Sequence, residues 1–476
     1  MENFDVCVLG GGPAGYVGAL KSAINGLSVA IIEKDRFGGT CLNRGCIPTK
    51  ILYSKAKYLS RLKAPERGFI VGEFSFNYGE IIDYKDEVVL TLTGGVEKLL
   101  KARKVKIFYG SGRVVGSNDN DFRLGITLNE YSADKNIEET QISAKNIIIA
   151  TGSSPLMISS FNIDHKSVIT SDEALSLREI PESLIIIGGG VIGCEFANIF
   201  SEFGSNVKII ELLPSILSTE DVEISRFIRK AFKSRNIDML NGAEVGSIVP
   251  APANGKGKAA VTLKSGEIFE ADKVIVSIGR RLNTSGLGLE DIGIKTNERG
   301  RISIDSRNET NIKGAYACGD IIAGPMLAHK ASFDGIIAAD NIAGINREKN
   351  YDVLPRSIYT NPPIGTVGLK EGDDGLSSDY NTGRFSYAAN GMALAMEEKE
   401  GFLKVLVEEN SKKIIGADVP ELIAEIASHM HYGGTIFDIE STIHSHPTLS
   451  EIVPESALDS IGEAIHKFNS RAAKKH

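Results

Sequence analysis

The chain carries one strand–glycine–helix–strand pattern twice, and this repeat restricts its fold more than any other feature of its 476 residues. In each copy an apolar strand runs into three spaced glycines, a helical pattern follows, and a second apolar strand ends in a glutamate. The first copy contains Gly10, Gly12, Gly15 and Glu33. The second copy contains Gly188, Gly190, Gly193 and Glu211. The interval from glycine to acid is the same in both copies, which predicts two equivalent α/β units.

The glycine spacing is typical of a dinucleotide-binding unit. The first glycine allows a tight turn, the second lets the backbone approach a pyrophosphate, and the third lets the helix pack on the strand. The helix N-terminus binds the phosphates, and the terminal carboxylate accepts hydrogen bonds from a ribose diol. A single motif would be weak evidence, but two complete copies predict two dinucleotide sites and therefore two cofactors.

The segment after the second acid indicates which nicotinamide cofactor binds there. The carboxylate of Glu211 would repel a 2′-phosphate, and residues 212–217 contain no Arg or Lys to receive one. NAD is therefore favoured over NADP.

Cys41 and Cys46 lie between the first unit and a helical stretch expected from about Pro48. If residues 43–46 form the first helical turn, the two thiols can approach disulfide distance. A helix N-terminus stabilises a thiolate and so lowers the pKa of a thiol. A structural disulfide this local would close a very small loop and stabilise the fold little. The pair is therefore predicted to be redox-active.

The bulk composition limits the partners. A chain of this length needs several domains, and a net charge of −8 argues against nucleic-acid binding. Five cysteines do not form a secreted disulfide framework, and no metal site is predicted. No signal peptide or apolar run of about 18 residues is visible, so no membrane span is expected and the cytoplasm is the expected location.

The rest of the chain contains fewer chemical signals. Strands over 146–149 and 273–278 meet glycine turns, and a short strand before Asp320 leads to a helix expected near Met326. An Asp in that position is more often a helix cap. Residues 250–258 are predicted to be a surface loop. From Val353 onward, alternating strands and amphipathic helices predict a separate α+β domain.

The segment from His444 to Glu451 is the second candidate for chemistry. A dithiol enzyme needs a base to take and return a thiol proton, and histidine suits this at neutral pH. Glu451 could orient an imidazole there. Taken alone, such histidines are more often ordinary surface or hydrogen-bonded residues, and His429 and His431 keep that interpretation.

Together these motifs resemble the pyridine nucleotide-disulfide oxidoreductases over nearly the whole chain. The resemblance rests on both glycine motifs, the Cys41/Cys46 segment, the turn at 150–152, residues 316–320 and the run 444–451. The ending Thr-Leu-Ser-Glu is closer to the lipoamide branch of the family than to the glutathione branch.

The resemblance implies a role for each candidate residue. FAD would lie on the first glycine motif and Glu33, with Asp320 on its ribityl chain, and NAD would lie on the second motif and Glu211. Cys41 would exchange disulfides with the substrate, while Cys46 would contact the flavin. Lys50 would lie near the flavin and pair with Glu195. His446, oriented by Glu451, would be the acid–base and would come from the partner subunit of a homodimer. Further cofactor contacts would be made by Gly152, Gly279 and Ala328.

The implied architecture is α/β, with two Rossmann-like domains and an α+β C-terminal dimerisation domain. Residues 1–150 and 276–350 would bind FAD, 151–275 would bind NAD, and 351–476 would form the interface. Two features depart from the family pattern: Leu282 replaces a usual proline, and the loop 415–423 is shorter than usual. The loop belongs to the expected dimer surface and involves none of the chemical residues.

The implied activity is oxidation of protein-bound dihydrolipoamide to lipoamide through the Cys41–Cys46 disulfide and FAD, with reduction of NAD⁺ to NADH. No lipoyl domain is visible, so the lipoyl group would come from an acyltransferase of a 2-oxo acid dehydrogenase complex or from a glycine cleavage carrier protein. A basic segment of such a partner would suit the acidic chain.

Three alternatives remain open. A glutathione-type reductase would prefer NADPH, which the absence of basic residues after Glu211 disfavours. A mercuric-ion reductase would need an extra C-terminal thiol pair, and no Cys follows Cys318. A non-catalytic flavoprotein assembly subunit would have no need of the intact thiols and base.

Overall fold

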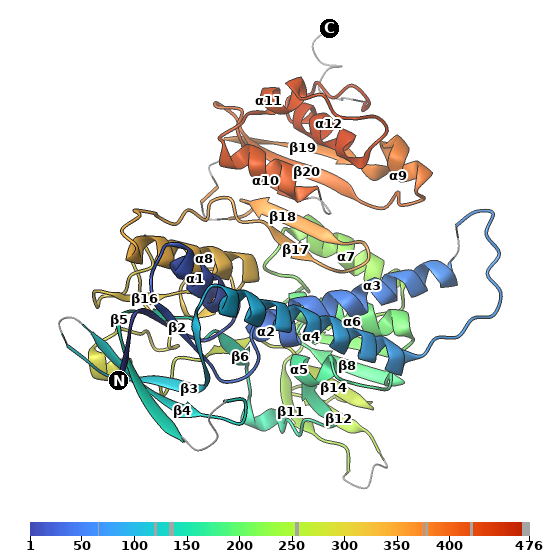
Figure 1. Ribbon diagram of the computed structural model, residues 1–476. Coiled ribbons are helices and arrows are strands. Elements are labelled where there is room, and N and C mark those ends of the chain that lie inside the picture. Colours follow the sequence, from blue (N-terminus) through green and yellow to red (C-terminus); the bar gives the residue numbers. More distant parts are fainter. Residues whose placement is uncertain are drawn as a thin grey trace.

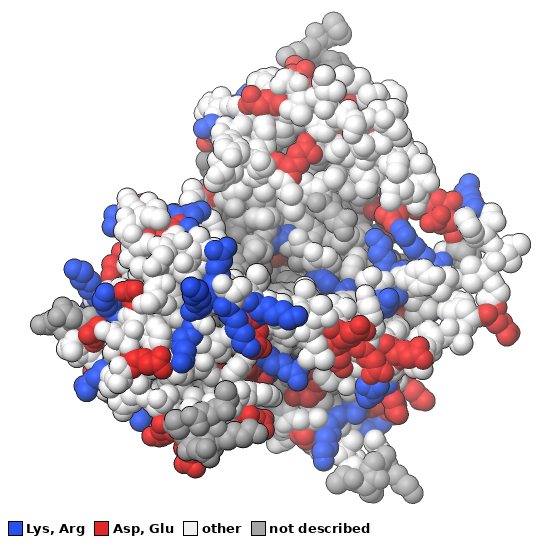
Figure 2. Space-filling model, in the orientation of Figure 1, with Lys and Arg blue, Asp and Glu red and all other residues white. Residues whose placement is uncertain are grey.

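The computed structural model describes residues 1–64, 66–118, 121–132, 138–252, 257–373, 375–376, 379–418 and 422–468. Two α/β domains form the lower body of the molecule, and the C-terminal α+β domain stands above them (Figure 1). The surface is hollowed between this upper domain and the body, and Lys and Arg side chains gather on the body beside the hollow (Figure 2).

The first domain is built on a parallel sheet with strand order β3-β2-β1-β5-β16, in which antiparallel β4 also joins β3 to β5. Alternate residues of β1 and β2 enter different cores, because successive side chains of a strand point to opposite faces. The strands are β1 (Glu2–Leu9), β2 (Val29–Glu33), β3 (Lys106–Ser117), β4 (Phe122–Leu128), β5 (Glu139–Ile149) and β16 (Ala315–Ala317).

Two helices of this domain, α1 (Pro13–Ile24) and α8 (Ala328–Ile342), are far apart in the sequence but adjacent in space. They pack closely because Gly335 lies against α1, where a Cβ atom would stand 2.2 Å from the carbonyl oxygen of Ala14. The other helices are α2 (Gly39–Arg44), α3 (Cys46–Lys63) and α4 (Tyr78–Ala102), with short turns η2 (Glu290–Ile292) and η3 (Gly319–Ile321).

The second domain repeats the design with a parallel sheet of order β10-β9-β8-β14-β7. Its strands are β7 (Val168–Thr170), β8 (Ser183–Ile187), β9 (Asn206–Glu211), β10 (Asp238–Asn241) and β14 (Lys273–Val276), and an antiparallel ribbon adds β11 (Val245–Val249), β12 (Ala259–Leu263) and β13 (Ile268–Ala271). Its helices are α5 (Ser171–Ala174), α6 (Val191–Phe203), α7 (Val222–Ser234) and the turn η1 (Ser159–Phe161). β14 continues one residue past the domain boundary predicted after residue 275.

A two-stranded ribbon connects the two domains. β6 (Ser153–Pro155) leaves the first domain and β15 (Arg280–Leu282) returns to it, paired antiparallel. Leu282 is 9% exposed and belongs to a core cluster of the first domain, so the residue that departs from the family pattern is a packing residue here.

The C-terminal domain has an antiparallel sheet of order β17-β18-β21-β20-β19, as the alternating pattern predicted. The strands are β17 (Arg356–Ile358), β18 (Ile364–Gly368), β19 (Tyr380–Ser386), β20 (Phe402–Glu408) and β21 (Ile414–Asp418). The helices are α9 (Gly391–Ala395), α10 (Ile423–His431), α11 (Ile436–Ser441) and α12 (Ile452–Asp459), with turns η4 (Tyr387–Ala389) and η5 (Leu449–Glu451).

Two helix starts predicted from the sequence need correction, and two predicted loops lie partly outside the described residues. The helix after the cysteines begins at Cys46 rather than Pro48, and the helix expected near Met326 begins at Ala328. Of the two predicted loops, residues 253–256 and 419–421 lie outside the described residues. Within the described part of the chain, no helix is long and apolar enough to cross a membrane.

Candidate functional site

The first glycine motif is shaped by contacts of the backbone with itself. Gly10 has φ +99°, and a Cβ atom there would lie 2.5 Å from the carbonyl oxygen of Ala150. A Cβ on Gly15 would lie 1.8 Å from the carbonyl oxygen of Gly10. Around Gly12, by contrast, the nearest atom would be 3.8 Å away. The outer glycines are therefore required by the fold, while the middle one leaves open space at the start of α1.

The second motif has the same geometry. Gly188 has φ +103° with a Cβ position 2.6 Å from the carbonyl oxygen of Ser277, and a Cβ on Gly193 would lie 2.0 Å from the carbonyl oxygen of Gly188. A Cβ on Gly190 would meet no atom within 4 Å. Each unit thus keeps an open cradle at a helix N-terminus, which suits a pyrophosphate.

The two acids lie against these turns in the same way. Glu33 accepts hydrogen bonds from the backbone N–H groups of Gly11 (2.6 Å) and Asp35 (2.7 Å), and burial raises the pKa of its carboxyl group. Glu211 accepts from Gly189 (2.5 Å) and Leu213 (2.7 Å). Both carboxylates therefore reach the glycine turn, where a ribose diol would be bound.

Asp320 lies at the end of β16, opposite the connecting ribbon. It accepts a hydrogen bond from Ser153 Oγ (2.5 Å), and Arg280 donates to the same hydroxyl (2.6 Å) and to the Ser153 carbonyl (2.7 Å). The turns at Gly152 and Gly279 have φ +66° and +131° and adjoin this ribbon. Ala328 is the first residue of α8.

The cysteines lie on two consecutive helices, the short α2 and the longer α3, rather than in one helical turn. Cys41 is in α2, Gly45 interrupts the helix with φ −148° and ψ −114°, and Cys46 begins α3. A side chain on Gly45 would crowd Thr40, since its Cβ would lie 2.9 Å from the Thr40 carbonyl oxygen. Residues 43–46 therefore do not form the single helical turn on which the expected approach of the two thiols was conditional, yet the two thiols still interact across the break.

Cys41 and Cys46 are free thiols, and hydrogen bonding between them shifts their two pKa values in opposite directions. The bond from Cys41, helped by the ammonium group of Lys50, lowers the pKa of Cys46 from 9.0 to about 7 despite its burial. The same bond, together with burial, raises the pKa of Cys41. These opposite shifts favour ionisation of Cys46 before that of Cys41.

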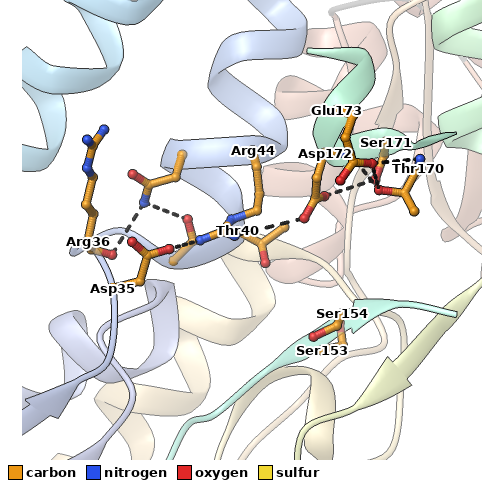
Figure 3. A network of polar contacts seen from close by, with 12 residues as sticks. Asp35, Arg36, Thr40, Arg44, Ser153, Ser154, Thr170, Ser171, Asp172 and Glu173 are labelled. Carbon is orange, nitrogen blue, oxygen red and sulfur yellow. Dashed lines mark hydrogen bonds and ion pairs between the residues drawn. The ribbon is translucent and has the colours of Figure 1, made fainter. Parts of the chain in front are cut away.

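Polar contacts anchor α2 between the two α/β domains (Figure 3). Arg44 pairs with Asp35 beside β2 and lies 4.0 Å from Asp172 in α5. Asn43 donates hydrogen bonds to the carbonyls of Phe37 (3.1 Å) and Gly39 (2.9 Å). The segment that carries Cys41 is thereby tied to both domains.

Lys50 and Glu195 form the ion pair that the resemblance implied. Lys50 Nζ lies 2.8 Å from both carboxylate oxygens of Glu195, although the two residues are 145 positions apart. Tyr359, from the C-terminal domain, donates its backbone N–H to Glu195 (3.0 Å), and its ring lies 4.4 Å from Lys50 Nζ. All three domains thus meet beside the cysteines.

His446 lies on the surface of the C-terminal domain, before η5. Its Nδ1 is hydrogen-bonded to Glu451 (2.7 Å), and its side chain is 79% exposed. The adjacent His444 is instead 9% exposed and bonded to Glu425 (2.6 Å). In one subunit the described contacts do not bring His446 to the cysteines, so an exchange site would need a second copy of the chain.

Comparison with known proteins decides the family. Residues 4–335 match the model described as pyridine nucleotide-disulphide oxidoreductase, and residues 354–457 match the dimerisation domain of that family. The chain belongs to the pyridine nucleotide-disulphide oxidoreductase family. This membership confirms the predicted fold class, and the cofactors are FAD and NAD. The dimerisation-domain match supports the predicted homodimer.

Individual members of the family cover almost the whole chain. Mitochondrial dihydrolipoyl dehydrogenase of Dictyostelium discoideum is 39% identical over 98% of this chain and 96% of its own length. Dihydrolipoyl dehydrogenase of Bacillus subtilis strain 168 is 38% identical, over 97% and 99%. Among solved structures, LpdA from Mycobacterium tuberculosis has a TM-score of 0.88 at 26% identity, covering 96% of this chain and 99% of its own. RclA from Escherichia coli, an HOCl-induced flavoprotein disulfide reductase, has a TM-score of 0.82 at 27% identity, over 95% and 99%.

The geometry fits the cofactors of this family. Each unit has an open cradle at its middle glycine and a carboxylate at the glycine turn, and Asp320 faces the ribbon beside the first unit. The first unit lies next to the segment that carries the cysteines, since a Cβ on Gly12 would lie 3.8 Å from Gly39.

Three residues outside the predicted set join the site: Arg44, Arg280 and Tyr359. Arg44 and Arg280 adjoin predicted residues in the sequence, and their charge was the available signal. Nothing local marks Tyr359, because only the packing of the C-terminal domain on α3 and α6 brings it to Lys50.

Proposed function

We propose that this chain oxidises protein-bound dihydrolipoamide to lipoamide and reduces NAD⁺ to NADH. The observation that carries the proposal is the placement of the two free thiols, Cys41 and Cys46, beside the Lys50–Glu195 ion pair and next to the first dinucleotide cradle. The relatives named dihydrolipoyl dehydrogenase support the choice of substrate.

The first half-reaction transfers two electrons from the substrate to the cysteines. A substrate thiolate attacks Sγ of Cys41 in the oxidised enzyme, the new S–S bond forms, and Cys46 leaves as a thiolate. The second substrate thiolate then attacks the substrate sulfur of the mixed disulfide and displaces Cys41, which takes up a proton. Lipoamide leaves, and the cysteines are a dithiol that shares a proton.

The resting geometry favours this division of roles. Because its pKa is lowered to about 7, Cys46 is the better leaving group, and Cys41 is the sulfur on which the substrate is exchanged. FAD supplies, when bound, the redox chemistry that turns the two electrons of the dithiol into a hydride for NAD⁺. Glu195 holds Lys50 beside Cys46 in both half-reactions. The positive charge of Lys50 therefore continues to favour the thiolate form of Cys46.

His446 of the partner subunit is the proposed base of the exchange. Its Nδ1 is held by Glu451, which keeps Nε2 on the exposed side of the ring. At Nε2 it would take the proton of the first substrate thiol and deliver it to Cys41 when that thiolate leaves.

The lipoyl-bearing partner is also part of the proposal. We infer an acyltransferase lipoyl domain or a glycine cleavage carrier protein as the partner, because these are proteins that carry a lipoyl group. The cytoplasmic location remains a prediction from the sequence.

The test is an anaerobic assay of the purified holoenzyme with dihydrolipoamide, offering NAD⁺ and NADP⁺ separately. We expect turnover with NAD⁺, a long-wavelength absorption band in the reduced enzyme, and loss of both in Cys46→Ser. Cys7→Ala removes a buried thiol of β1 outside the site and is the matched control, expected to keep both signals. Turnover that survives Cys46→Ser, or disulfide reduction that runs only with NADPH, would overturn the proposal.

A further inference from the structure

A buried ion pair that the proposed chemistry does not use lies directly beneath Asp320. Lys330 and Asp334 stand one turn apart on α8, with Nζ and Oδ2 separated by 2.9 Å, and their side chains are 1% and 0% exposed. Burial raises the pKa of Asp334 against the effect of Lys330. Removing two charges from water is costly, so a buried pair is weak evidence for stability by itself.

The pair holds both backbone groups of one residue, Gly319. The N–H of Gly319 donates to Asp334 Oδ2 (3.0 Å), and Lys330 Nζ donates to the Gly319 carbonyl at 3.5 Å. Gly319 has φ +81°, a conformation that favours glycine, and Asp320 follows it. The direction of the Asp320 side chain therefore depends on a backbone that the ion pair fixes from below.

Further contacts fix the pair itself. The Tyr351 hydroxyl donates to Asp334 Oδ1, and Asn308 Nδ2 donates to the Asp334 carbonyl (3.2 Å). Cys318 Sγ donates to the same carbonyl at 3.4 Å. Both carboxylate oxygens of Asp334 are thus occupied, and the aspartate cannot turn away from Gly319 without breaking several buried hydrogen bonds.

We propose that Asp334 and Lys330 are positioning residues for FAD, which act by holding Gly319 so that Asp320 points at the polyol chain of the cofactor. The inference rests on the role given above to Asp320. It extends that role, because the binding of FAD would then depend on two buried residues of α8 as well as on Asp320 itself.

The test compares FAD binding in variants of two buried ion pairs. Asp334→Asn keeps the size of the side chain but removes its charge. The control is Asp221→Asn in the pair Lys404–Asp221, which has the same kind of burial (2% and 1% exposed, 2.8 Å) and lies away from the first glycine motif. FAD dissociation is measured on the diluted holoenzyme by the recovery of flavin fluorescence, and unfolding is measured with FAD in excess.

We expect the dissociation constant for FAD to rise about 10-fold to 100-fold in Asp334→Asn, since a hydrogen bond to a charged group is lost, and to change less than twofold in Asp221→Asn. Tyr351→Phe, a milder change at a half-buried site, is expected to weaken FAD several-fold without altering the unfolding midpoint. An unchanged FAD affinity in Asp334→Asn, or an equal loss in Asp221→Asn, would overturn the proposal.

A double-mutant cycle distinguishes positioning from a merely structural role. If Asp334 acts through Asp320, the Asp334→Asn change should cost much less FAD affinity in an Asp320→Asn background. Full additivity of the two changes would contradict action through Asp320. The measurement needs no substrate, so an enzyme that binds FAD as expected but fails to oxidise dihydrolipoamide would sink the proposed function and leave this inference standing.

Discussion

Two glycines of the second motif, three residues apart, should respond in opposite ways to the same added methyl group. Gly190 caps the N-terminus of α6 with φ −74° and ψ −173°, which alanine can adopt, and a Cβ there would meet no protein atom within 4 Å. A Cβ on Gly193 would lie 2.0 Å from the Gly188 carbonyl oxygen. Gly190→Ala should therefore impair NAD binding and leave the fold intact, while Gly193→Ala should impair the fold.

The size of each effect follows from these contacts. Ordinary contact begins near 3.4 Å, so at Gly193 helix and strand must separate by about 1.4 Å (3.4 minus 2.0), and overpacking of this kind costs about 1–3 kcal/mol. At Gly190 the change in unfolding free energy should stay within about 0.5 kcal/mol. The methyl group would instead occupy the pyrophosphate space, and a tenfold rise in KM for NAD⁺ corresponds to ~1.4 kcal/mol.

The assay combines urea unfolding of the holoenzyme, calorimetric NADH binding and steady-state KM for NAD⁺. FAD content serves as the internal control, because the first glycine motif is untouched. If Gly190→Ala binds NADH as well as the parent, the cofactor does not cross that glycine. If Gly193→Ala is as stable as the parent, the packing argument is wrong.

Three further perturbations test the site and the domain contacts. Lys50→Met should raise the pKa of Cys46 from about 7 toward 9.0, because a nearby positive charge is lost, and the pH profile of Cys46 alkylation measures this; an unchanged midpoint would contradict it. His446→Gln should lower turnover about 100-fold or more, whereas His466→Gln, in an equally exposed pair with Glu455 (2.7 Å), should not, and equal losses would refute the assignment. Burial, helped by Asp221 and Glu220 and opposed by Lys404 and Arg356, raises the pKa of Asp418 to about 7. The folded state therefore holds this proton above the ordinary value of 3.8, and stability falls as pH rises from about 4 to 7. Asp418→Asn should raise the free energy of unfolding by roughly 1–3 kcal/mol at pH 8 and change it little at pH 4. Denaturant unfolding at pH 8 and pH 4 measures this, and no gain at pH 8 would contradict the prediction.

Local patterns were sufficient for the two nucleotide-binding units. The positive φ of Gly10 and the contact of Gly15 with the carbonyl oxygen of Gly10 belong to the turn itself, so spacing alone predicts the turn and the helix that follows, although Gly10 also meets the distant carbonyl oxygen of Ala150. The intervals that place Glu33 and Glu211 at the turns are likewise set by one strand–helix–strand passage. The break at Gly45 was missed because a helix pattern does not reveal which residue interrupts it.

The amino-acid sequence by itself determined the repeated units, the position of the cysteine pair and the family. Only the tertiary structure decided which side chains surround them. The resemblance had implied the Lys50–Glu195 pair, but nothing in the sequence placed Tyr359 from another domain against both residues, or Asp334 of α8 against Gly319. The physical reason is range: glycine turns and helix starts are set by neighbours in the chain, whereas a buried charge finds its partner only when distant elements pack together and exclude water.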